Sequence, residues 1–267
     1  MFAVPGLYCQ ETDIFNYSNS LKFANYLYNN KEFGLALNEY KRILFINPSN
    51  IEANIKIHDS YIRLRQYAEG VNYSNRVYPK SVENDTLTIL RGKLLLLDGN
   101  FSQFDSEIPN DSFLSDEGTI FLKMSENVFQ KNWIGAEKYT EDALKYPGMS
   151  PFVSIVKKAA SIKYKKPAVS LMMSAVLPGS GKIYSGYWKD GLVSFLFVGI
   201  SAWQSYRGFS RKGSRSAYGW IMGGISLSFY SGNIYGSVKA ANKKNYEYNH
   251  AILNDFKKDF ISAYSSY

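Results

Sequence analysis

The segment Leu177–Gly186, LPGSGKIYSG, is the part of the chain whose residue types and spacing come nearest to a phosphate-binding loop. In such a loop the backbone N–H groups of a glycine-rich turn cradle the phosphates, and a lysine reaches the outer ones. Here Val176 stands where the first glycine is needed, and Ile183 follows Lys182 where a serine or threonine should stand. No strand-like run precedes the segment. We therefore expect no nucleotide binding there.

Histidine and cysteine are too scarce for a metal centre of the usual kind. The chain has one cysteine, Cys9, and two histidines, His58 and His250. Neither histidine has a cysteine or a carboxylate at ligand spacing, and the sequence holds no nucleophile motif. We therefore expect no metal, no cofactor and no enzyme activity, and we interpret both histidines as structural.

Positive charge is concentrated in the second part of the chain. Residues 1–160 hold 17 Lys and Arg against 19 Asp and Glu, a net charge of −2, whereas residues 161–267 hold 14 against 4, a net charge of +10. A basic segment of this kind favours a nucleic acid or an anionic membrane surface. Its charges flank apolar runs instead of forming one stripe, so we expect a lipid partner and no nucleic acid.

The elements that would carry any binding residues recur with a period of 34 residues in the first half of the chain. Phe33, Tyr67 and Phe101 are 34 residues apart, and smaller residues recur at the same interval, although His58 interrupts their series. Each helical hairpin has an apolar face that it cannot bury alone, and stacking several hairpins buries a continuous core.

This pattern resembles the tetratricopeptide repeat, with a small residue inside the first helix, a bulky residue near the turn and a small residue opening the second helix. Ala24, Phe33 and Ala36 provide these features in the first repeat, and the match weakens in later repeats. The resemblance implies an all-α fold with a helical-hairpin solenoid over residues 11–160. An irregular helical bundle is the alternative.

The resemblance also implies a concave groove, lined by the first helix of each hairpin, that binds a segment of a protein partner. We expect no clamp for a carboxylate terminus, because Leu21 and Asp59 depart from the Lys, Asn and Arg that such clamps use. Ordinary surface and packing roles remain the alternative for the candidate groove residues. These are Leu21, Asn25, Tyr28, Asp59, Ile62 and Arg63.

Uncharged, largely apolar runs follow one another in the second half, at residues 167–181, 191–206 and 216–238. A membrane-spanning helix needs about 20 predominantly apolar residues, and tryptophan and tyrosine gather at the ends of such helices. We therefore predict a membrane-embedded helical hairpin over residues 167–240 and an amphipathic tail over 241–267. Two buried helices of a soluble domain are the alternative.

The glycine-rich element at the start of this region resembles the first part of a TM2-type membrane hairpin, although the aromatic residue before the tyrosine and an acidic residue in the second helix are missing. The matching residues are Pro178, Gly179, Gly181, Tyr184, Gly186 and Gly191. Glycines four residues apart let helix backbones approach closely in lipid, and they would also permit a homo-oligomer. These candidate packing residues are Gly219, Gly223, Gly232 and Gly236.

The first residues, 1–10, read as the remnant of a signal peptide, with an apolar end followed by polar sequence. We therefore hypothesise a membrane-anchored scaffold of the bacterial envelope. We expect its repeats to lie in the periplasm and to bind a protein partner in the assembly of envelope complexes. The alternative is a membrane component whose hairpin acts directly on lipid or in a small transport complex, with the repeats as its regulator.

Overall fold

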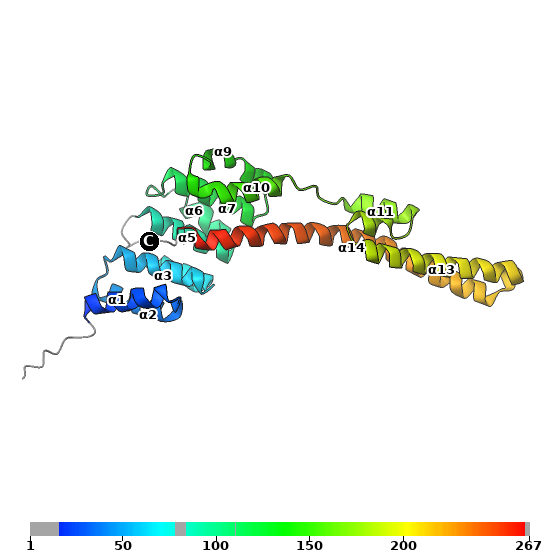
Figure 1. The fold of residues 1–267 in the computed structure, drawn as a ribbon, viewed down its shortest axis with the longest axis horizontal. Helices are drawn as coiled ribbons and strands as arrows, with labels where there is room; N and C mark the ends of the chain where they lie inside the picture. Colours follow the sequence, from blue (N-terminus) through cyan, green and yellow to red (C-terminus); the bar gives the residue numbers. More distant parts are fainter. Residues whose placement is uncertain (1–15, 78–83, 110, 265–267) are drawn as a thin grey trace, which may run out of the picture. The chain divides into compact units, whose positions relative to one another are not determined.

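The computed structural model describes residues 16–77, 84–109 and 111–264, and these residues form helices joined by turns, without any strand. The all-α fold class is therefore confirmed for this part of the chain. The predicted signal-peptide remnant, residues 1–10, lies outside the described residues. The helices fall into two compact units (Figure 1): unit 1 joins the chain up to Ala160 with the segment from Asp255 onward, and unit 2 runs from Ser161 to Asn254.

Unit 1 contains consecutive helices, most of them connected by turns of a few residues. Neighbours in sequence also contact each other in space, as the pairs α1 and α2, α3 and α4, and α7 and α8 do. The helices are α1 (Tyr17–Asn29), α2 (Phe33–Ile46), α3 (Ile51–Arg63), α4 (Tyr67–Val77), α5 (Asp85–Asp98), α6 (Phe101–Glu107), α7 (Asp116–Phe129), α8 (Trp133–Glu137), α9 (Thr140–Ala143) and α10 (Ser150–Ala160).

The 34-residue period of the sequence reappears in the helix boundaries. Helices α1, α3 and α5 begin at residues 17, 51 and 85, and α2, α4 and α6 begin at residues 33, 67 and 101. Asn16, Asn50 and Asn84 cap the first set, each accepting a hydrogen bond on its side-chain oxygen from the backbone N–H three residues later. An asparagine in this position satisfies an N–H group that the helix itself leaves unpaired.

Small residues set the distances between the helices of unit 1. Ala24 and Ala36 are fully buried. A Cβ added at Gly70 would lie 2.7 Å from a side-chain atom of Leu94, and one added at Gly92 would lie 2.7 Å from a side-chain atom of Leu122. The side chains of Leu94 and Leu122 therefore fill the space beside Gly70 and Gly92. The helix pairs pack closely at the positions where the period places small residues.

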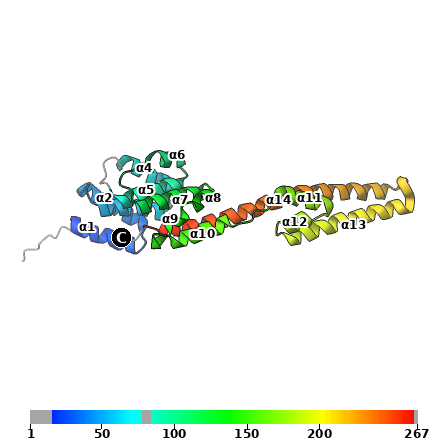
Figure 2. The same cartoon turned by 90° about the horizontal axis from the view of Figure 1, so that it is seen from above.

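Unit 2 contains α11 (Pro167–Val176), the short α12 (Ser180–Tyr184), α13 (Trp188–Lys212) and the greater part of α14 (Ala217–Ser262), with a 3₁₀ turn at Gly213–Arg215 between the last two. Helices α13 and α14 run side by side (Figure 2). Ser205 donates its hydroxyl proton to the Gly219 carbonyl at 2.8 Å, and the rings of Phe197 and Phe229 lie 5.2 Å apart.

The predicted apolar run 191–206 falls in α13, and the run 216–238, apart from Ser216, falls in the first half of α14. In the described part of the chain, no helix is both long enough and apolar enough to cross a membrane.

Candidate functional site

The candidate groove residues of α1 and α3 meet at the buried carboxylate of Asp59. Tyr28 donates its hydroxyl proton to Asp59 Oδ2, and Arg63 Nε donates to the same oxygen at 3.3 Å. Only 1% of Asp59 is exposed, and within the described residues its Oδ1 atom has no hydrogen-bond partner. Helices α1 and α3, which begin 34 residues apart, therefore bring Tyr28, Asp59 and Arg63 together. We call these three residues the Asp59 cluster.

The electrostatics of this cluster keep Tyr28 a hydrogen-bond donor. Burial, and then the charge of Asp59, raise the pKa of Tyr28 well above its ordinary value, so the phenol stays protonated. The Lys56 ammonium lies 4.1 Å from the centre of the Tyr28 ring, within the range of a cation–π contact. Burial lowers the pKa of Lys56, while the carboxylate of Asp59 opposes that shift.

The other candidate groove residues lie near this cluster in different environments. Asn25 accepts a hydrogen bond from the Tyr40 hydroxyl at 2.5 Å, and its amide lies 3.5 Å from Glu52 Oε1. Leu21 is half-buried, and Ile62 is fully buried in the core. Asn25 thus lies close to Glu52, the exposed acidic residue in the first turn of α3.

Lys93 of α5 is a site residue that the sequence analysis missed. Its side chain is fully buried, and Nζ donates hydrogen bonds to the carbonyl oxygens of Ile261, at 3.2 Å, and Ala263. The last carbonyl groups of a helix lack partners within it and favour a nearby cation. Lys93 therefore binds the C-terminal end of α14.

The environment of Lys93 differs from that of a surface lysine. Burial lowers the pKa of Lys93 to about 7, and the charge of Asp59 opposes that shift while the charge of Arg63 adds to it. Lys93 is thus within electrostatic reach of the Asp59 cluster. Its sequence signal was a lysine inside the apolar run of residues 89–97, where a charge needs a partner.

Aromatic side chains complete the seat for the end of α14. Phe260 stacks on Phe121 with ring centres 5.3 Å apart, and it meets the edge of Phe129 at 5.0 Å. Phe256, one turn earlier, meets Phe152 at 5.3 Å. Both α14 phenylalanines are fully buried. Together with Lys93, these rings hold the final turns of α14 against α5, α7 and α10 (Figure 1).

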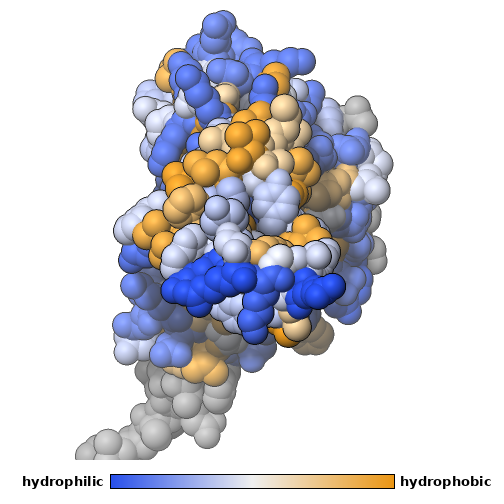
Figure 3. Space-filling model, turned by 90° about the vertical axis from the view of Figure 1, so that its right-hand side faces the viewer, coloured by the Kyte–Doolittle hydropathy of each residue, from blue (hydrophilic) through white to orange (hydrophobic). Residues whose placement is uncertain are grey.

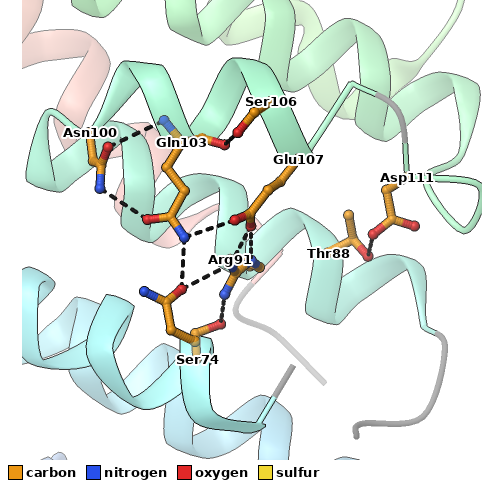
Figure 4. Close-up of polar contacts among 9 residues, drawn as sticks. Ser74, Thr88, Arg91, Asn100, Gln103, Ser106, Glu107 and Asp111 are labelled. Atoms are coloured by element: carbon orange, nitrogen blue, oxygen red, sulfur yellow. Dashed lines mark hydrogen bonds and ion pairs between the residues drawn. The ribbon is translucent and has the colours of Figure 1, made fainter. Parts of the chain in front are cut away.

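A second buried cation, Arg91, joins α5 to its neighbours (Figure 4). Its guanidinium donates to Ser74 Oγ at 2.7 Å, to Asn75 Oδ1 at 3.0 Å and to the Glu107 carboxylate. Burial alone would raise the pKa of Glu107, but hydrogen bonds from Arg91 and Gln103 and the charge of Arg91 lower it overall. This network links α4, α5 and α6 and leaves the guanidinium well partnered, which is typical of a structural role.

His58 of α3 is a buried histidine whose ring stays neutral near pH 7. Its Nδ1 lies 2.8 Å from the Asn54 carbonyl oxygen, and burial lowers the pKa of the ring to about 4. In the described part of the chain, no group of three His, Cys, Asp or Glu side chains is arranged to hold a metal ion. The Asp59 cluster and Lys93 instead offer charged donors and acceptors for backbone groups and side chains.

The glycine-rich element of unit 2 forms a tightly packed corner between α11, α12 and α13. Gly179 has a φ of +86°, and a Cβ added to it would overlap the carbonyl oxygen of Gly191. A Cβ at Gly181 would overlap the carbonyl oxygen of Ser170, and one at Gly191 would lie 2.6 Å from the Gly179 carbonyl oxygen. Close backbone approach therefore requires glycine at all three positions, and the positive φ adds a conformational reason at Gly179.

Polar contacts fasten the same corner to α14. Gly179 N–H donates to Asn233 Oδ1 at 3.1 Å, and Ser170 Oγ donates to the Ser237 carbonyl at 2.8 Å. The Tyr184 hydroxyl accepts from the Lys166 N–H at 3.2 Å. Of the remaining residues of the element, Pro178 is half-buried, and Gly186 is exposed with a φ of +90°.

The four candidate packing glycines have three different surroundings. Gly219 and Gly223 face α13, since an added Cβ would lie 2.9 Å from the Phe209 ring and 3.0 Å from Ser205 Oγ, respectively. An added Cβ at Gly236 would lie 3.1 Å from Lys182 Cε. Gly232 has nothing within 4 Å. Two of the four thus serve the close approach of α13 and α14 within this chain.

Comparison with family models, with curated proteins and with solved structures finds no match for this chain.

Proposed function

We propose that the chain is a scaffold of the bacterial envelope in which tetratricopeptide-like hairpins of unit 1 bind a protein segment and unit 2 associates with a membrane. The observation that supports protein binding by unit 1 is the way in which its helices bind the end of α14. Lys93 takes its backbone carbonyls, and Phe121, Phe129 and Phe152 take its aromatic side chains. This surface has the chemistry needed to hold a helical segment.

The partner would lie beside that seat, along α1 and α3. The charges of Asp59 and Arg63 act on Lys93, and Arg63 and Asn25 remain partly accessible. Exposed Glu52, at the start of α3, adds a carboxylate close to Asn25. A partner segment with amide or cationic groups could donate hydrogen bonds to the Glu52 carboxylate. Arg63 could in turn donate hydrogen bonds to carbonyl groups of the partner.

A photo-cross-linking amino acid at selected positions tests this proposal in native membranes. We expect a defined partner adduct from positions Leu21 and Asn25, on the proposed surface. Glu69 is the control, because it lies exposed on α4, outside the candidate groove. Adducts of equal yield from Glu69, or none from Leu21 and Asn25, would count against partner binding at this surface.

The proposed membrane association rests on the apolar side chains that α13 and α14 leave uncovered. Monomeric soluble proteins rarely expose large contiguous apolar patches, and such patches mark membrane or protein contacts. Figure 3 shows hydrophobic residues beside strongly hydrophilic ones on one face. The exposed apolar residues of these two helices are Trp188, Leu192, Val193, Phe195, Leu196, Phe197, Ile200, Trp203, Tyr206, Tyr218, Trp220, Ile221, Ile225, Leu227, Phe229, Tyr235 and Tyr246.

Basic residues accompany this apolar surface. Arg207, Arg211, Lys212 and Arg215 are all exposed around the turn between α13 and α14. Long cationic side chains can lie along apolar surface while their charges reach anionic headgroups. We propose a membrane location for the chain, with unit 1 on the exported side.

A further inference from the structure

Unit 2 holds a small cavity of about 200 Å³ where one face of α14 meets α12 and the start of α13. This volume lies below the roughly 300–1,000 Å³ typical of pockets for drug-sized ligands. A ligand here must therefore be small, or must insert one small group. The lining residues are Lys182, Tyr187, Asp190, Gly236, Lys239, Ala240 and Lys243.

The lining carries three ammonium groups against one carboxylate. Lys182, Lys239 and Lys243 form no salt bridge within the described part of the chain, and neither does Asp190. Glu247, one turn beyond Lys243, is engaged elsewhere. It accepts a hydrogen bond from the Tyr187 hydroxyl at 2.7 Å and one from Lys244 at 3.3 Å. The cavity therefore has an excess positive charge that an anion would balance.

Two of the three lysines around the cavity have contacts that orient their side chains. Lys182 Nζ donates to Ser194 Oγ at 2.7 Å, and Ser194 in turn donates to the Asp190 carbonyl at 2.9 Å. Nζ keeps two further protons for a ligand. The ammonium of Lys243 lies 5.3 Å from the centre of the Tyr187 ring, whose hydroxyl is bonded to Glu247.

Gly236 provides the space for this arrangement. A Cβ at residue 236 would lie 3.1 Å from Lys182 Cε and 3.4 Å from Lys182 Nζ. A larger side chain at this position would displace the ammonium and occupy the cavity that Gly236 lines. Gly232, one turn earlier on α14, has open space instead and offers a matched control.

We infer that this cavity binds a phosphate group, either in the headgroup of an anionic phospholipid or as a free phosphate ester. Lysine ammonium groups form charge-assisted hydrogen bonds with phosphate oxygens, and three of them would neutralise one phosphate beside Asp190. Binding of a phospholipid headgroup rests on the proposed membrane association. Recognition of the phosphate group itself rests only on the residues that line the cavity.

Vesicle flotation with the full chain tests the inference. Vesicles of phosphatidylcholine would be compared with vesicles that also contain phosphatidylglycerol, and with vesicles carrying the same negative charge on a carboxylate lipid. A parallel calorimetric titration with inorganic phosphate and glycerol phosphate would detect a free source. We expect tighter binding to phosphatidylglycerol than to the carboxylate lipid, and about tenfold weaker binding for Lys239→Gln and Gly236→Val.

The controls are Lys138→Gln, which removes an exposed charge of unit 1 outside the cavity and outside the proposed membrane surface, and Gly232→Val on the same helix as Gly236. Both should bind as the unchanged chain does, and circular dichroism should show equal helix content in all four variants. Binding of inorganic phosphate or glycerol phosphate in the titration, with no preference for phosphatidylglycerol vesicles, would indicate that the ligand is a free phosphate ester.

Two results would overturn the inference: a loss with Lys138→Gln equal to that with Lys239→Gln, or binding of neither phosphate probe above the level of the Gly236→Val variant. Failure to float with any vesicle would instead refute the membrane association, and the titration would still decide on the phosphate site.

Discussion

Two buried cations on one helix have different roles in unit 1. Arg91 meets a carboxylate, a hydroxyl and an amide, so its charge is balanced within the hairpins. Lys93, two residues later, is also buried, but it binds the backbone carbonyls of Ile261 and Ala263. Burying a cation is costly unless it is well paired. Lys93 therefore depends on the end of α14, and that end depends on Lys93.

Replacing Lys93 by methionine should loosen the end of α14. The substitution keeps a long apolar side chain but leaves the carbonyls of Ile261 and Ala263 without their cationic partner. Hydrogen exchange of the amides of residues 256–264 should become about 10- to 150-fold faster, since a lost charged hydrogen bond weakens the contact by roughly 1.5–3 kcal/mol. Lys123→Met on α7 is the control. Unchanged exchange in the Lys93 variant would show that Lys93 does not fasten this segment.

His58 should make the stability of unit 1 sensitive to mild acid. Burial lowers the pKa of His58 to about 4, whereas the unfolded chain has an ordinary value near 6.5. Between these values the unfolded state binds more protons, so stability is lost as the pH falls from about 6.5 to 4. The loss between pH 7 and 4.5 should be about 2 kcal/mol.

Urea unfolding at the two pH values measures this effect. The His58→Gln variant should lack most of the pH-dependent loss, and His250→Gln, at an exposed position, should keep it. A loss of the same size in both variants would assign the acid sensitivity to other groups, among them Glu107, whose pKa is also shifted.

At the scale of elements, the periodic part of the fold was predictable from sequence. The starts of α2, α4 and α6 coincide with Phe33, Tyr67 and Phe101, which the period singled out. The spacing of Asn16, Asn50 and Asn84 was visible in the sequence as well, but it gains meaning only as a set of helix caps. These signals come from residues close together in sequence, so the helix starts can be predicted without knowledge of long-range contacts.

The contacts of the last helix could not be predicted in the same way. The amphipathic pattern of the tail does not specify which surface the tail contacts. Phe256 contacts Phe152 and Phe260 contacts Phe121, each across more than 100 residues of sequence, and nothing local specifies these contacts. Lys93 was missed for the same reason, because its partners are backbone carbonyls that carry no sequence signal.

Phe260→Ala should destabilise unit 1 substantially. The ring is fully buried and contacts Phe121 and Phe129, so its removal should lower the free energy of unfolding by about 3–5 kcal/mol. Chemical denaturation of the full chain measures this loss. Tyr246→Ala removes a ring of similar size from an exposed position on the same helix and should cost less than about 1 kcal/mol. Equal effects of the two substitutions would mean that the end of α14 adds little to the stability of unit 1.

At the scale of the whole molecule, the two units differ in what they leave exposed. In unit 1 the apolar side chains mostly pack between helices, with Phe45 and Ile134 among the exceptions. In unit 2, glycines allow the backbones of α11, α12 and α13 to approach closely. The outward faces of α13 and α14 nevertheless expose apolar side chains. The proposed scaffold, in which one unit binds protein and the other contacts lipid, would account for the exposed apolar faces of unit 2.

Collision-accessibility measurements on single spin labels test the lipid contact of unit 2 most directly. Labels would replace Leu196 on α13, Leu227 on α14 and, as a control, Ile134 of unit 1, all exposed apolar residues, in a chain with Cys9 changed to serine. With membrane vesicles, the account predicts that labels at Leu196 and Leu227 collide more with oxygen, which concentrates in lipid, than with a water-soluble nickel complex, and that the label at Ile134 does the reverse. Labels at all three positions that collide mainly with the nickel complex would contradict it.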